Sequence, residues 1–271
     1  MDATTTTTAC PRCGSAPQGS CAACRTGSGY QPVKDRWLEV RPALRQAAEP
    51  FDWAIGTEHG GLVAVWDWER GEFVPTGHDD RHARYLWLEL TTRCPHRCRH
   101  CYLGDRLGGA VAAPEAVRVA LRTAGRWDVA EVVLAGGEPT MHPAFVDLLA
   151  EARRAAPRVR VLTNGWTQRP EVVAALAQPG VSVEVPLLGW EADHDWMTRT
   201  PGSFVRVVRS LHLYRRAGVA LTLTTTLTRR VRPALDRLRA LAEELGVPFQ
   251  PSVLSRQGEA ARHWDELAWE A

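Results

Sequence analysis

Residues 85–102 read YLWLELTTRCPHRCRHCY, a strand-like apolar run followed directly by three closely spaced cysteines. These are Cys94, Cys98 and Cys101, in the spacing C-x3-C-x2-C. Three thiolates this close in sequence can wrap one compact metal centre, and a [4Fe–4S] cluster held by three cysteines keeps one iron open to a further ligand. The spacing alone also allows a zinc site completed by a histidine of the same loop, or buried structural cysteines.

The chain downstream of this loop alternates between strand-like and helix-like segments. Prolines stand where the intervening helices are expected to begin, and glycines stand just after their expected ends. Six βα units in series predict an α/β fold with a parallel sheet, a partial (β/α)6 TIM-like barrel. In such barrels the chemistry lies on the loops that follow the strands. The strands are predicted at residues 85–90, 132–135, 159–162, 181–188, 219–226 and 249–254.

Two further motifs follow the second and third of these strands. Residues 135–140 read AGGEPT, and residues 162–165 read LTNG. A C-x3-C-x2-C loop, a Gly-Gly-Glu-Pro and a Thr-Asn-Gly, in this order at successive strand ends, resemble the radical S-adenosylmethionine (SAM) superfamily. The resemblance covers residues 84–271.

The resemblance implies a radical enzyme and assigns roles to individual residues. The three cysteines of the loop would hold a [4Fe–4S] cluster, and the amino and carboxylate groups of SAM would bind its fourth iron. Reduction would cleave SAM to a 5′-deoxyadenosyl radical, which takes a hydrogen atom from the substrate. Gly136, Gly137 and Glu138 would accept hydrogen bonds from the methionine ammonium, and the absence of Cβ on the glycines would let their carbonyls approach it. The residues implied in SAM binding are Gly136, Gly137, Glu138, Pro139, Asn164, Arg199 and Tyr102.

The fourth predicted strand and the loop after it resemble those of peptide-modifying members of the superfamily. It contains LLG at residues 187–189 and RTPGSF at residues 199–204. Arg199 matches the arginine that contacts SAM in those members, whereas Pro186 stands where they carry a serine, so the serine contact is not carried over. The resemblance implies maturation of a ribosomally made peptide. A small-molecule biosynthetic enzyme is the alternative, and a non-catalytic iron–sulfur electron-transfer or binding protein is a third interpretation.

Four more cysteines lie near the N-terminus as two C-x2-C pairs. This arrangement resembles a zinc ribbon or knuckle and suits tetrahedral zinc, with an auxiliary iron–sulfur cluster as the alternative. All seven cysteines of the chain are then assigned, so no thiol remains in the barrel to return a hydrogen atom to a substrate radical. We therefore expect an oxidative cross-link or a rearrangement rather than an epimerisation. The four residues are Cys10, Cys13, Cys21 and Cys24.

Composition and charge set broader limits. The chain is 45% hydrophobic with a net charge of +2, which demands neither a nucleic-acid nor a membrane partner. Cysteines grouped as metal ligands suit a reducing, cytoplasmic setting, where flavodoxin or ferredoxin would supply single electrons. The expected organisation is a disordered threonine run with the zinc-knuckle-like segment at 1–29, a β-containing connector of unassigned role at 30–83, and the barrel at 84–271. Within the connector, residues 62–74 are expected to form a β-hairpin that turns near Gly71.

Overall fold

The structure is a computed structural model that describes residues 51–57, 62–76 and 84–269. The N-terminal cysteines Cys10, Cys13, Cys21 and Cys24 lie outside these ranges, so the zinc-knuckle hypothesis stays a prediction. Within the described ranges, nine strands form one sheet in the order β3-β2-β1-β4-β5-β6-β7-β8-β9. Their bounds are β1 Trp53–Thr57, β2 Leu62–Asp67, β3 Glu72–Pro75, β4 Arg84–Thr91, β5 Val129–Gly136, β6 Arg158–Leu162, β7 Val181–Pro186, β8 Ala220–Leu227 and β9 Phe249–Val253.

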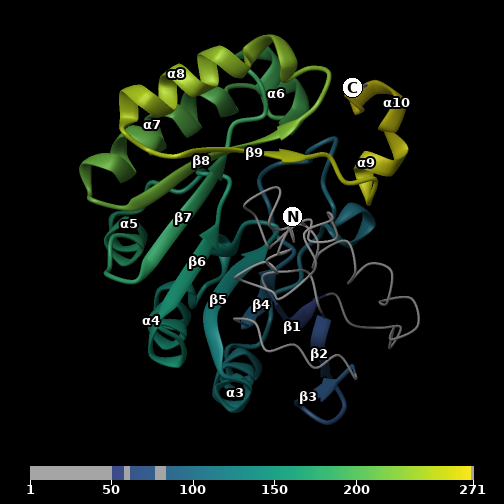
Figure 1. Cartoon of the computed structure of the whole chain (residues 1–271), viewed down its shortest axis with the longest axis vertical. Helices are drawn as coiled ribbons and strands as arrows, with labels where there is room; N and C mark the ends of the chain where they lie inside the picture. Colours follow the sequence, from purple (N-terminus) through teal and green to yellow (C-terminus); the bar gives the residue numbers. More distant parts are fainter. Residues whose placement is uncertain (1–50, 58–61, 77–83, 270–271) are drawn as a thin grey trace, which may run out of the picture.

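Strands β4 to β9 are parallel, and each pairs with the next along the chain. The predicted α/β fold and partial barrel are therefore confirmed, with strands at the six predicted places. Helices α3, α4, α5, α7 and α8 lie along the outer side of the curved sheet (Figure 1). No helix in the described ranges is both long and apolar enough to cross a lipid bilayer. The helices are α3 Pro114–Ala124, α4 Phe145–Ala155, α5 Pro170–Leu176, α6 Ala192–Thr198, α7 Ser203–Arg216, α8 Leu235–Leu245, α9 Glu259–Arg262 and α10 Trp264–Leu267.

The period of two along the strands separates the main core from the inner side of the barrel. Leu86 and Leu88 of β4 and Leu134 of β5 are fully buried in the large core shared with the outer helices. The intervening residues, including Tyr85 and Val133, form a smaller cluster that packs against side chains of the inner pocket. Each central strand is thus covered on both faces, as is usual for parallel sheets.

The connector continues the same sheet. The predicted hairpin forms from β2 and β3, with Gly71 at a φ of 65° in its turn. Strand β1 was not predicted, and it pairs antiparallel with both β2 and β4. It thereby covers the edge of β4, which would otherwise expose unpaired backbone groups. The indole Nε1 of Trp53 also donates a hydrogen bond of 2.9 Å to the backbone carbonyl of Glu89 in β4.

Replacing Trp53 by alanine tests whether the connector and the barrel unfold together. Trp53 is 1% exposed, and its ring centroid lies 4.5 Å from that of Trp68 and 5.4 Å from that of Trp66. Losing such a ring from a core costs about 3–5 kcal/mol. Because β1 pairs with β4, we expect one urea transition by tryptophan fluorescence and circular dichroism, shifted to lower urea. A separate early transition that leaves the barrel at its wild-type midpoint would contradict a shared fold.

Candidate active site

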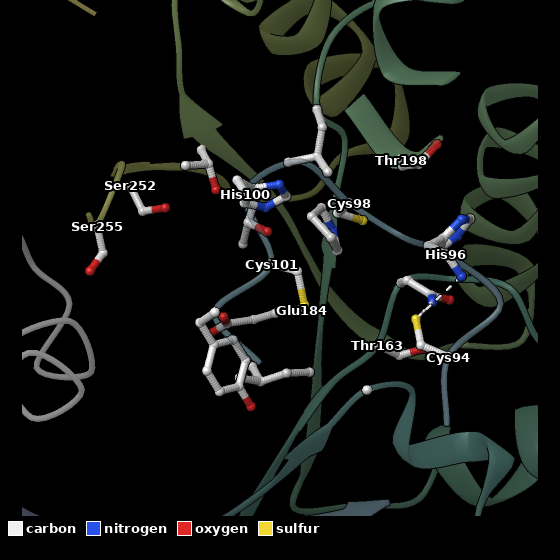
Figure 2. A pocket seen from close by; sticks show the side chains of 18 of the residues that line it. Cys94, His96, Cys98, His100, Cys101, Thr163, Glu184, Thr198, Ser252 and Ser255 are labelled. Carbon is white, nitrogen blue, oxygen red and sulfur yellow. Dashed lines mark hydrogen bonds between the residues drawn. The ribbon is translucent and has the colours of Figure 1, made fainter. Parts of the chain in front are cut away.

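The three cysteines of the loop after β4 line one pocket with a volume of about 270 Å³ (Figure 2). All three are free thiols and partly exposed. Backbone hydrogen bonds hold the loop against the end of α6: the N–H of Arg97 donates to Thr198 at 3.1 Å and that of Arg99 to Met197 at 2.9 Å. The loop therefore has a fixed position over the ends of the parallel strands.

The surroundings of the three thiols affect their protonation. Burial raises the pKa of Cys94 to about 12, and burial likewise raises the pKa of Cys98. A positively charged iron centre would offset this cost, because metal ligation favours the thiolate.

Gly136 and Gly137 line the pocket and allow the loop after β5 to pack against the cysteine loop. A Cβ on Gly136 would lie 2.4 Å from the carbonyl oxygen of Thr91, and one on Gly137 would lie 2.4 Å from that of Arg93. The backbone N–H groups of Gly137 and Glu138 donate to the same two carbonyls, each at 2.7 Å. The glycines are thus required by contact between two chain segments, a reason that the sequence did not reveal.

The side chain of Glu138 differs from the sequence-based expectation. Glu138 is fully buried and does not line the pocket. Its Oε1 accepts hydrogen bonds from the backbone N–H of Thr140 at 3.1 Å, the Thr140 hydroxyl at 2.6 Å and the Thr163 hydroxyl at 2.8 Å. Its Oε2 accepts from the backbone N–H of Asn164 at 2.7 Å. The carboxylate is engaged by its own chain, and the expected hydrogen bond from it to SAM stays a prediction. Pro139, which is also buried away from the pocket, begins the short 3-10 helix η3, Pro139–Met141.

Asn164 connects the Glu138 carboxylate to the cysteine loop. Its side-chain Nδ2 lies 3.5 Å from the Cys94 sulfur, and its Oδ1 accepts a hydrogen bond of 2.9 Å from the backbone N–H of Trp166. Asn164 lines the pocket, as expected for a residue that contacts a ligand there.

Tyr102 also lines the pocket and is held by a buried carboxylate, that of Glu89. The Tyr102 hydroxyl donates to Glu89 Oε1 at 2.8 Å, and Glu89 Oε2 accepts from Arg106 at 2.9 Å and from the backbone N–H of Asp52 at 2.8 Å. Arg106 also pairs with the Asp52 carboxylate at 2.8 Å. Glu89 was not among the predicted site residues, although it is the lone carboxylate within an apolar strand.

Arg199 is not brought to the pocket. It caps α6 with a left-handed φ of 52°, and its guanidinium donates a hydrogen bond of 2.7 Å to His263 Nε2. Its other terminal nitrogen lies 3.9 Å from a carboxylate oxygen of Glu259. The guanidinium thus contacts His263 and Glu259, and the expected contact between Arg199 and SAM stays a prediction.

His194 is a pocket residue that the predicted site did not include. Its Nδ1 accepts a hydrogen bond of 3.1 Å from the backbone N–H of Leu188, which places the ring proton on Nε2. His194 lines the pocket, and its buried Nε2 has no hydrogen-bond partner in the described part of the chain. Burial lowers the pKa of His194 to about 4, so the ring is neutral near pH 7.

The Radical SAM superfamily matches residues 88–232, which is more than half of the chain. The chain therefore belongs to the radical SAM superfamily, as the motifs predicted. Membership implies a [4Fe–4S] cluster and SAM, and the three thiols around one pocket fit that pair of cofactors.

The relatives in this superfamily are named for different reactions. Mycofactocin maturase MftC of Mycobacterium ulcerans (strain Agy99) is 33% identical over 186 residues, which cover 67% of this chain and 50% of that protein. AdoMet-dependent heme synthase of Methanosarcina barkeri is 29% identical over 172 residues, covering 60% of this chain and 48% of that protein. The chain thus spans about half the length of these relatives.

Among solved structures, Streptococcus suis SuiB bound to its precursor peptide SuiA is similar with a TM-score of 0.57. The identity is 18%, and the match covers 62% of this chain and 38% of that one. At this identity the similarity shows the fold alone.

Replacing Glu138 by glutamine separates a structural role from a direct contact with SAM. Whichever way the amide is turned, its NH2 group faces a backbone N–H, of either Thr140 or Asn164. An unmade buried hydrogen bond costs about 1–3 kcal/mol. We expect that loss in the free energy of unfolding of protein without iron or SAM, measured in urea. The control is Glu151→Gln, which removes a partly exposed ion pair to Arg118 and should cost less than about 1 kcal/mol. If Glu138 acted only by contacting SAM, its variant would unfold like the wild type.

Proposed function

We propose that the chain is a radical SAM enzyme in which Cys94, Cys98 and Cys101 hold a [4Fe–4S] cluster. The observation that carries the proposal is that these three thiols open into one pocket within a superfamily barrel. Together, cluster and SAM supply a 5′-deoxyadenosyl radical that can take a hydrogen atom from a substrate. The protein's part is to bind, orient and shield these groups.

Several pocket-lining residues are placed to bind the cluster and SAM. The backbone carbonyls of Gly136 and Gly137 would accept hydrogen bonds from the SAM ammonium, since both glycines line the pocket. Asn164 would stay close to the cluster through its contact with Cys94. Tyr102 would flank the cluster and the adenine, with its hydroxyl held by Glu89. For Arg199 to reach the SAM carboxylate, its bond to His263 would have to break on binding.

We propose a peptide as the substrate and its maturation as the reaction, with an oxidative cross-link or a rearrangement as the outcome. The similarity to a maturase, mycofactocin maturase MftC, supports this assignment. The similarity to a heme synthase supports the second candidate, a small-molecule biosynthetic reaction. In either case an external one-electron donor such as flavodoxin or ferredoxin would reduce the cluster. The quartet Cys10, Cys13, Cys21 and Cys24 would bind zinc or, alternatively, an auxiliary cluster.

Two matched cysteine variants of the full chain test the metal assignments. Replacing Cys94, Cys98 and Cys101 by alanine should remove about four irons per chain and abolish reductive SAM cleavage, while zinc content stays unchanged. Replacing the N-terminal quartet by serine should remove about one zinc and leave the four irons. Metal analysis and 5′-deoxyadenosine formation after anaerobic reconstitution are the measurements. Equal iron in the wild type and the first variant would overturn the cluster assignment, and loss of iron with sulfide from the second would identify an auxiliary cluster.

Mass spectrometry of reaction products tests the substrate class. Precursor peptides encoded beside the gene should react on incubation with the reconstituted protein, SAM and a reductant, and should stay unchanged with the triple-alanine variant. A cross-linked product loses the mass of two hydrogens, whereas a rearranged product keeps its mass and changes its fragmentation pattern. In deuterated water, a product of unchanged composition that carries one deuterium at an inverted centre would contradict the expected reaction. Conversion of an iron porphyrin, with no change in any peptide, would favour the small-molecule candidate.

A further inference from the structure

The inner side of the barrel presents a polar wall to the pocket. Four successive strands contribute to it, and in-register pairing sets Thr224 beside Gln250 and Thr226 beside Ser252. Figure 2 shows Glu184 and Ser252 among the side chains around the same pocket as the three cysteines. We define the polar wall as Arg160, Glu184, Thr224, Thr226, Gln250 and Ser252.

Two members of the wall, Arg160 and Glu184, belong to a charged triad completed by Glu131, which does not line the pocket. Arg160 lies between two carboxylates: its Nη1 is 3.1 Å from Glu184 Oε1, and its Nη2 pairs with Glu131. One positive and two negative groups give this triad a net charge of −1. Among the described pocket-lining residues, Arg160 and Glu184 are the only arginine, lysine, aspartate or glutamate, and Glu131 lies behind them.

An excess negative charge beside a confined pocket favours a positively charged ligand over a negatively charged one. The side chains of Arg160, Glu184 and Glu131 are 25%, 20% and 13% exposed, so water screens them weakly. Burial raises the pKa of Glu184, and the neighbouring Arg160 opposes the effect. A cation placed at Glu184 would gain attraction, and an anion would be repelled.

The polar wall also offers uncharged hydrogen-bonding groups. The threonine, glutamine and serine side chains of the wall can donate and accept hydrogen bonds without carrying charge. Such groups can bind the N–H and C=O groups of a peptide main chain.

We propose that the pocket selects a substrate segment that carries a positively charged ammonium or guanidinium group, which pairs with Glu184. The proposal rests on the proposed function in taking this pocket as the substrate site. The charged group could belong to a lysine or arginine side chain or to a peptide N-terminus. Glu131 strengthens the selection through Arg160 without touching the substrate.

Short blocked peptides measure this preference directly. The probes are acetyl-Gly-Lys-Gly-amide, its norleucine and glutamate counterparts, and a norleucine tripeptide with a free N-terminus. Their dissociation constants are determined by calorimetry on the full chain loaded with cluster and SAM. We expect the lysine peptide to bind about tenfold or more tightly than the glutamate peptide, as one charge-assisted hydrogen bond implies. Tight binding of the free N-terminus instead would assign the site to a peptide amine.

Glutamine at position 184 is the decisive variant. Glu184→Gln keeps an oxygen for Arg160. It should reduce the ratio of affinities for the lysine and glutamate peptides to below about threefold and leave the affinity for SAM unchanged. Glu151→Gln, which removes a charge from outer helix α4, should leave the ratio as in the wild type. Should Glu184→Gln fail to fold, Thr226→Asp adds a negative charge to the polar wall and should raise the ratio.

Three results would overturn the proposal: no charge preference in the wild type, a ratio unaffected by these wall variants, or a Glu184 variant that loses SAM rather than the lysine probe. The last result would assign Glu184 to the cofactor. SAM cleavage measured on the same preparations tests the proposed function separately. Cleavage without a charge preference removes only this inference, and a charge preference without cleavage removes only the proposed activity.

Discussion

The buried carboxylate of Glu138 is the interaction on which the geometry of the site depends. A carboxylate removed from water is costly unless its oxygens receive hydrogen bonds, and here four donors surround it. Two of those donors come from the loop after β5 and two from the loop after β6. The loops therefore cannot move apart without leaving a buried charge unpaired. Asn164 extends this connection to Cys94, so the position of the first thiol follows from the same carboxylate.

A second buried carboxylate, Glu89, acts on the other side of the cysteine loop. It receives hydrogen bonds from Tyr102 directly after the third cysteine, from Arg106 and from the backbone of Asp52. The loop is thus held between two carboxylates, one in β4 and one in the loop after β5. Asp52, directly before β1, also takes part, so the connector and the barrel share both the sheet and this network. Rigidity of this kind suits a site that must hold reactive groups in fixed positions.

The fold and the position of the site could be predicted from the sequence because both follow from local patterns. Strand periodicity placed β4 to β9, and motifs at successive strand ends had to meet at one edge of a parallel sheet. The direction of individual side chains could not be predicted in this way. Glu138 receives two of its four hydrogen bonds from the loop after β6, and the Arg199 guanidinium contacts His263, which lies 64 residues further along the chain. The pair between Arg106 and Asp52 joins residues far apart in the chain, which no local pattern encodes.

The polar wall gives the inner face of the barrel polar and charged side chains, whereas the outer face of the same strands packs apolar side chains into the core. Along β6, Val159 and Val161 pack into the main core, while Arg160 between them points into the barrel. Replacing a buried ion pair by apolar residues of similar volume is often neutral or stabilising, so stability alone does not account for a charged triad there. An apolar interior would also have been simpler to pack. A function in the pocket does account for it, because a charge held at a fixed place distinguishes between ligands even where it adds little to stability.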